Sequence, residues 1–215
     1  MRRLVILRAA LVAALVLTGV CAGTDARADG LTVTEQARLA NHETVARSQT
    51  LEREDRRYIG GVTYTVLDAP PSDVAAVIDD ADALQKVLPR TKTAHFTGRL
   101  GGDRLLEVTQ GNALMEATYT VRIKRDPSEA RFWLEPSLPH GIEDAWGFFR
   151  WQPWGDNQTL LTYAILVDVG PGIVRDFFED RFRAALLSVP QHVRRELADR
   201  TEAVRVRTAS YTTRD

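Results

Sequence analysis

The sequence contains very little cysteine. Its one cysteine, Cys21, lies within the first 28 residues, so a chain without that segment has no thiol. This absence excludes disulfides, a cysteine nucleophile and thiolate metal ligands from residues 29–215. Neither sign of charge dominates: the formal net charge is −1 for the whole chain, and residues 29–215, with 24 basic and 28 acidic side chains, carry −4. A chain of this charge does not predict nucleic-acid binding, which depends on a basic surface.

Familiar catalytic and metal-binding motifs are also missing. The sequence has no G-x-S-x-G elbow, no glycine-rich phosphate loop ahead of a lysine and no H-E-x-x-H pair. The segment with His140, Glu143 and Asp144 fits a polar turn before a strand better than a metal site, because no further histidine or cysteine lies near it. We therefore predict no catalytic residue, no metal and no cofactor. The four histidines, far apart in the sequence, are His42, His95, His140 and His192.

One apolar run stands out, at the N-terminus. After a basic start, residues 9–22 form an uncharged, largely apolar run of 14 residues. A membrane-spanning helix needs about 20. An A-x-A triplet ends at Ala28, which gives the segment the layout of a secretory signal peptide. We predict cleavage near Ala28 and a periplasmic or secreted mature protein. Lipidation of Cys21 is the less favoured alternative, because a lipoprotein signal has a small residue where this chain has Val20.

The rest of the chain divides into a polar arm, a strand-rich body and a helical end. Residues 29–59 are polar with a weak helical pattern, which predicts a partly helical N-terminal arm. A helical pattern returns over 172–200, where Pro190 should kink or divide the helix. Residues 201–215 have no apolar stripe, which predicts a flexible tail. Period-two patterns and turn residues predict strands over 61–69, 92–100, 103–110, 113–125, 130–136, 143–153 and 158–168, and two short helices over 73–80 and 81–88.

This order of elements predicts an α+β domain. Six consecutive antiparallel strands have one face to bury, and the final helix is the element long and apolar enough to cover it. We expect a helix-grip fold: a curved antiparallel sheet of about seven strands wrapped on a long C-terminal helix, with two short helices after the first strand. A strongly bent sheet cannot close tightly along one helix, so a pocket should lie between them.

Three stretches carry a resemblance to a known superfamily. They are VLDAPPSDVAAVIDDADALQKVLPRTK, with its strand, proline turn and paired helices, then LLTYAILVDVG, and then the long helix. Over residues 60–200 the chain resembles the START-like, helix-grip superfamily, which includes lipid-transfer START domains, plant pathogenesis-related allergens and polyketide cyclases. The resemblance implies an apolar ligand held between the sheet and the C-terminal helix. It implies no particular activity, because this fold hosts transfer proteins, binders and enzymes.

The resemblance also implies which side chains line the pocket. Charges at Glu116, Arg122 and Lys124 mark the wet face of one strand, so the alternate positions should point inward. Tyr119 and Tyr163 are the candidate polar groups, because a buried phenol needs a partner, which a ligand or a backbone carbonyl can supply. The predicted ligand-binding residues are Met115, Tyr119, Phe132, Leu134, Phe149, Trp151, Tyr163, Ile165, Phe178 and Phe182.

The stretch WGFFRWQPW, residues 146–154, has large aromatic residues on both faces of a strand. If Phe149 and Trp151 point into the pocket, Trp146 and Phe148 point outward. Two large aromatic side chains exposed together are unusual for a monomer. We favour the N-terminal arm as their cover, with a second subunit and a membrane surface as the alternatives.

These features predict an exported protein that binds or transfers a lipid or another hydrophobic small molecule. We expect no nucleic-acid partner, and the sequence favours binding over catalysis. Transient membrane contact and the oligomeric state are left open. One alternative is an enzyme of the polyketide cyclase or aromatase type, which would need a polar residue such as Glu107, Arg122 or His140 turned into the pocket. Another is a non-catalytic envelope interaction module that docks through Trp146 and Phe148.

Overall fold

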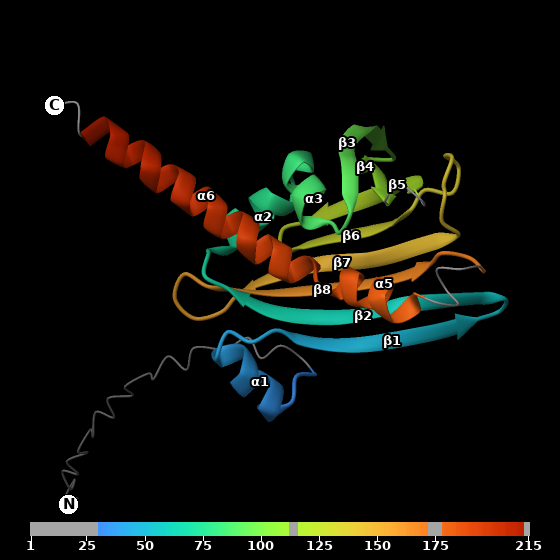
Figure 1. The fold of residues 1–215 in the computed structure, drawn as a ribbon, viewed down its shortest axis with the longest axis horizontal. Helices are drawn as coiled ribbons and strands as arrows, with labels where there is room; N and C mark the ends of the chain where they lie inside the picture. Colours follow the sequence, from blue (N-terminus) through green and yellow to red (C-terminus); the bar gives the residue numbers. More distant parts are fainter. Residues whose placement is uncertain (1–29, 112–115, 172–177, 213–215) are drawn as a thin grey trace, which may run out of the picture.

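Eight antiparallel strands form one sheet in a computed structural model of the chain, in the order β1-β2-β8-β7-β6-β5-β4-β3 (Figure 1). The structure describes residues 30–111, 116–171 and 178–212. Strand direction turns strongly across the sheet, so that β3 runs at a steep angle to β1. The strands are β1 (Val45–Arg53), β2 (Arg56–Leu67), β3 (Thr91–Leu100), β4 (Asp103–Gly111), β5 (Glu116–Asp126), β6 (Glu129–Leu134), β7 (Asp144–Pro153) and β8 (Thr159–Asp168).

The meander from β3 to β8 agrees with the strands predicted from the sequence, to within a few residues at each end. Its hairpins pair in chain order, and β8 then pairs with β2 to join the first part of the chain to the last. Alternation in β7 shows why the prediction works: Ala145, Gly147, Phe149 and Trp151 are buried, while the residues between them keep accessible surface. One face of the sheet is therefore the interior of the protein.

Two short helices, α2 (Pro71–Ile78) and α3 (Ala81–Val87), follow β2 as predicted. Pro71 begins α2 at a position where the missing N–H costs nothing. Asp80 caps α3, since its carboxylate accepts hydrogen bonds from the backbone N–H groups of Asp82 and Ala83 at 3.0 and 3.4 Å. Both helices lie over the same face of the sheet as the C-terminal helices (Figure 1).

The C-terminal helix is divided, as the sequence predicted from Pro190. Helix α5 (Glu179–Leu187) ends at Ser188, and α6 (Val189–Thr212) begins one residue later, so Pro190 stands in the first turn of α6, where a proline is tolerated. Residues 201–212, which the sequence predicted as part of a flexible tail, continue α6 away from the sheet (Figure 1), and their flexibility stays a prediction. Residues 201–206 are exposed, which accounts for the missing apolar stripe.

The N-terminal arm departs further from its prediction. Only α1 (Val33–Ala40) is helical, and residues 45–53 form the edge strand β1, so the sheet has eight strands where about seven were expected. Most side chains of β1 are exposed, which removes the alternation that would have predicted a strand. The predicted signal peptide and its cleavage point near Ala28 lie outside the described residues. No described helix combines the length and the apolar character that a bilayer crossing requires.

The core lies between the inner face of the sheet and helices α2, α3 and α6. Trp151 and Leu161 of the sheet pack there with Val74 of α2, Val87 of α3 and Val193 of α6, all nearly inaccessible to solvent. The helix-grip architecture predicted from the sequence is thus confirmed. Burial of these side chains from five separate elements holds the helices against the sheet.

Candidate functional site

An aromatic cluster occupies the inner face of the sheet. Phe149 of β7 lies between Phe132 of β6 and Tyr163 of β8, with ring centroids 5.8 and 4.7 Å away, and Phe132 and Tyr163 are 6.4 Å apart. Gly147 makes this possible, because a Cβ at that position would lie 2.6 Å from the Phe132 ring and 2.1 Å from the carbonyl oxygen of Ala164. The sequence phase that placed these three aromatic residues inward is confirmed.

Two phenols lie in this region with different partners. The hydroxyl of Tyr119, on β5, donates a hydrogen bond to the side-chain oxygen of Gln110 on β4. The hydroxyl of Tyr163 forms no hydrogen bond with any residue that the structure describes, although the side chain is only 1% exposed. Burial raises the pKa of both phenols, and the nearby Tyr119 adds to the increase at Tyr163, so both stay neutral at physiological pH.

Several inner-face residues are only half-buried even though they point toward the helices. They include Tyr119, Phe132 and Ile165 on the sheet and Phe182 on α5. Phe182 and Ile165 both border a small cluster formed by Ala145, Val167 and Leu186. An apolar surface that faces inward and keeps accessible area is the kind of surface that an apolar ligand can cover.

One cavity lined by described residues is small. A cavity of about 100 Å³ lies at the other side of the core, where Leu67 and Asp68 meet Arg194, Leu197 and Thr201 of α6. Sites for drug-sized ligands have volumes of roughly 300 to 1,000 Å³. That cavity is not the expected pocket, because none of the predicted ligand-binding residues lines it.

The predicted site residues fall into three groups. Trp151 and Leu134 are buried and point inward with the aromatic cluster. Phe178, expected on the inward side of the helix, is the N-cap residue of α5 and is 44% exposed. Met115 lies outside the described residues. Whether these side chains contact a ligand stays a prediction.

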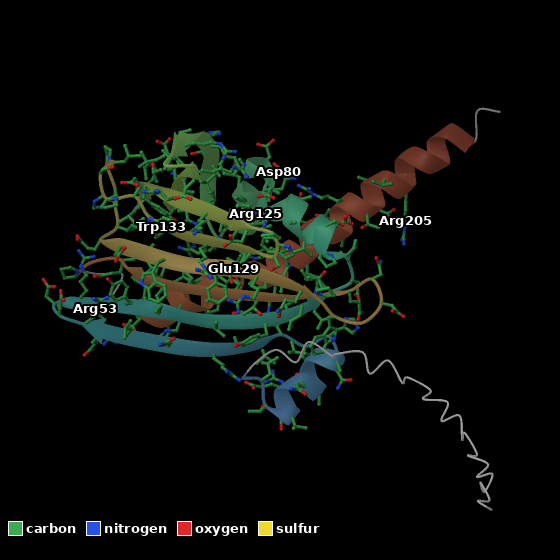
Figure 2. All side chains as sticks on the ribbon, turned by 180° about the vertical axis from the view of Figure 1, so that it is seen from behind. Arg53, Asp80, Arg125, Glu129, Trp133 and Arg205 are labelled. Atoms are coloured by element: carbon green, nitrogen blue, oxygen red, sulfur yellow. The ribbon has the colours of Figure 1, made fainter. Side chains whose placement is uncertain are left out.

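The outer face of the sheet carries a second aromatic group, as the sequence phase indicated. Trp146 is 43% exposed and pairs across the strands with Trp133, while the Arg150 guanidinium lies 5.0 Å from the centre of the Phe148 ring. Figure 2 shows this side of the sheet, with Trp133 labelled. We predicted that the N-terminal arm covers these aromatic residues. This prediction is wrong for the described part of the arm, which packs elsewhere.

Helix α1 instead covers another part of that face. Leu31 and Leu39 pack against Val45, Val66 and Leu160 of the strands at the opposite edge of the sheet. The helix is fixed there by Glu35 in a capping box with Thr32, and by the Arg47 Nε, which donates to a Glu35 carboxylate oxygen at 2.8 Å. These hydrogen bonds lower the pKa of Glu35 to about 2, with the Arg47 bond contributing most.

The acid and base candidates of the enzyme alternative do not face the aromatic cluster. Glu107 of β4 is exposed on the outer face, opposite His95 of the neighbouring strand β3. Arg122 donates to Asp103 at 2.6 Å and lies over the Trp133 ring, also on the outer face. His140 is exposed in the turn before β7. Among the described residues, no three metal-binding side chains gather closely enough to hold an ion.

The sequence reasoning missed a charged cluster on the inner face. Arg104 of β4 and Arg125 of β5 both donate to the carboxylate of Asp79, the residue that ends α2. A signal for it was present in the sequence: Arg125 shares the period-two phase of Tyr119 and Val121, so the same alternation that selected the aromatic residues also points this arginine inward.

Comparison with known proteins identifies the fold. No protein-family model and no curated protein matches the chain. Among solved structures, a STAR-related lipid transfer protein from Xanthomonas axonopodis matches with a TM-score of 0.58 at 15% identity, over 72% of this chain and 93% of that chain. A protein from Thermus thermophilus matches with a TM-score of 0.55 at 14% identity, over 64% of this chain and 96% of that one.

A third structure is that of a START superfamily protein from Mycobacterium smegmatis. It matches with a TM-score of 0.52 at 14% identity, over 66% of this chain and 97% of that chain. The START-like, helix-grip fold expected from the sequence is therefore confirmed, and the similarity extends over nearly all of each solved chain. At this level of identity the comparison is informative about the fold alone.

Proposed function

We propose that this protein binds a lipid or another hydrophobic small molecule between the inner face of the sheet and α5, and that it does so after export. The observation that carries the proposal is the aromatic inner face around Tyr163, where half-buried apolar side chains keep accessible area and the phenol hydroxyl forms no hydrogen bond with another described residue. A polar group on the ligand can pair with that hydroxyl.

The surrounding surface supports the same proposal. Phe132, Ile165 and Phe182 face inward and keep accessible area that a ligand would remove from water, at about 25 cal/mol for each Å² of apolar surface. One protein of the same fold is a STAR-related lipid transfer protein, which is consistent with a lipid as the ligand. Export is proposed from the N-terminal segment, whose basic start, apolar run and A-x-A triplet have the order of a signal peptide.

The test is to identify and then measure the ligand. Freshly purified protein and protein stripped in detergent and refolded are extracted with organic solvent, and both extracts are analysed by mass spectrometry. We expect a lipid-like molecule in the first extract alone. The stripped protein is then titrated with N-phenyl-1-naphthylamine, an apolar fluorophore, whose emission rises on burial.

Neighbouring residues of β6 supply a matched pair of variants. Phe132 and Trp133 are both half-buried aromatic residues, and they lie on opposite faces of the sheet. Phe132→Gln places an amide on the inner face and should weaken fluorophore binding about tenfold, whereas Trp133→Gln should leave it within about twofold of wild type. An empty first extract together with equal effects of the two variants would overturn the proposal.

A further inference from the structure

The C-terminal end of α2 is tied to the sheet by two arginines that share one carboxylate. The Arg104 guanidinium donates to the Asp79 carboxylate at 3.2 Å and to the Asp79 carbonyl at 3.0 Å. The Arg125 Nε lies 3.2 Å from each carboxylate oxygen of Asp79. In Figure 2, Arg125 is labelled beside Asp80, the residue that follows Asp79. Asp79 is 39% exposed, so the cluster is open to solvent on one side.

Positive charge is in excess at this cluster. Both guanidiniums are stacked on inner-face rings, with Arg104 at 3.5 Å from the centre of Phe96 and Arg125 at 4.3 Å from the centre of Trp151. Burial lowers the pKa of Arg104, and the charges of Arg99 and Arg125 lower it further, although Asp79 acts in the opposite direction. A single carboxylate therefore does not balance the arginines around it, and a second anion would find complementary charge.

The cluster is also aligned with the aromatic site. Arg125 pairs with Ala130, Ala130 with Phe149, and Phe149 with Tyr163, so one row across four strands leads from the arginine to the buried phenol. At about 4.8 Å between neighbouring strands, this row is about 14 Å long. Ala130, Phe149 and Tyr163 are buried beneath the helices in this structure. A molecule that enters along the row as α2 loosens would meet guanidiniums at one end, aromatic rings in the middle and a hydroxyl at the other end.

We propose that Arg104 and Arg125 bind the anionic group, a carboxylate or a phosphate monoester, of an amphipathic ligand whose apolar chain lies against Phe132 and Phe149. This inference rests on the proposed function and specifies the class of ligand. In the absence of ligand, Asp79 occupies the two guanidiniums. The ligand's anion replaces it, so binding also loosens the C-terminal end of α2 from the sheet.

Three probes separate the contributions of the chain and the charge. Stripped protein is titrated by calorimetry with dodecyl phosphate below its micelle concentration, dodecan-1-ol below its solubility limit, and inorganic phosphate. We expect dodecyl phosphate to bind at least tenfold more tightly than dodecanol, because a charge-assisted contact contributes more than a neutral one. Inorganic phosphate should bind more weakly than both, which identifies the amphiphile and not the free ion as the ligand.

Variants then test the arginines against a matched control. Arg125→Gln should weaken dodecyl phosphate about tenfold and leave dodecanol unchanged. Arg122→Gln removes a guanidinium from the same strand, also paired with an aspartate and also stacked on a ring, but on the outer face, and it should change neither affinity. Asp79→Asn removes the competing carboxylate and should tighten dodecyl phosphate several-fold, even if it lowers the stability of the protein.

The outcomes distinguish this inference from the proposed function. If dodecanol and dodecyl phosphate bind equally, or if Asp79→Asn weakens dodecyl phosphate, the arginines are a structural clamp and the inference is wrong while the apolar site remains. If neither amphiphile binds, the inference is wrong, and the proposed function is then decided by the extraction and the fluorophore titration. Circular dichroism and a cooperative urea transition establish that each variant is folded before its affinity is interpreted.

Discussion

Removing the hydroxyl oxygen from each of the two inner-face phenols, Tyr119 and Tyr163, should have different effects on stability. Tyr163→Phe deletes a hydroxyl that forms no hydrogen bond with a described residue, and the ring contacts with Phe132 and Phe149 remain. Tyr119→Phe deletes a hydroxyl that donates to Gln110. Both substitutions are conservative in shape, so the partner of the hydroxyl is the main difference between them.

The magnitudes follow from this difference. Tyr163→Phe breaks no hydrogen bond to a described residue and keeps the ring contacts, so it should leave the stability of the ligand-free protein within about 0.5 kcal/mol of wild type. The hydrogen bond of Tyr119 contributes about 0.5–1.5 kcal/mol, so Tyr119→Phe should destabilise by about 1 kcal/mol. In a chain of this size, a loss of about 1 kcal/mol corresponds to about 2–4 °C in Tm.

Urea unfolding of stripped protein, followed by tryptophan fluorescence, measures both values. Stripping matters because a bound ligand stabilises the folded state by mass action and would hide the effect. The slope of the transition should be unchanged, so that a shift of the midpoint reports stability alone. Adding ligand should then stabilise wild type more than Tyr163→Phe. A loss of about 1 kcal/mol or more in stripped Tyr163→Phe would mean that the protein itself pairs the hydroxyl, and the binding proposal would lose its main support.

Two further predictions concern the outer face. The pKa of Glu35 is lowered to about 2 in the folded state, so its contribution to stability is present above the ordinary pKa of 4.5 and is lost as pH falls toward 2. The difference in urea midpoint between wild type and Glu35→Gln should therefore shrink from pH 6 to pH 3. A constant difference would contradict the role of Arg47. The double variant Trp146→Ser, Phe148→Ser should keep the wild-type fold and elution volume in gel filtration, and a later elution with an intact fold would reveal a docking surface instead.

The strand order and the inward aromatic residues could be predicted because each rests on a local pattern. In β7 the alternation of buried and accessible positions is nearly complete, and in β5 the charges of Arg122 and Lys124 mark the outer face. Such patterns arise wherever one face of a strand is buried and the other is not. Pro190 likewise acts on its own helix, so the division between α5 and α6 was predictable from a single residue.

The elements that the sequence did not predict are held by contacts distant along the chain. β1 belongs to the sheet because it pairs with β2, while its exposed side chains carry no pattern of their own. The position of α1 depends on Glu35 meeting Arg47, 12 residues away. The polar arm has no hydrophobic periodicity that predicts which strands it packs against. The prediction that it covers the aromatic residues around Trp146 was therefore wrong.

Adjacent aspartates at the α2–α3 junction show how the two proposed parts of the site are mechanically related. Asp79 is held by sheet arginines, whereas Asp80 accepts from Arg200 of α6 at 2.6 Å. The same Arg200 guanidinium also donates to Glu196 of α6 at 2.9 Å. If an anion replaces Asp79, the junction stays attached to α6 through Asp80. We therefore expect the C-terminal end of α2 to loosen from the sheet when ligand enters while the junction stays attached to α6, because the pair of Asp79 with the sheet arginines is released and the pair of Asp80 with Arg200 is kept.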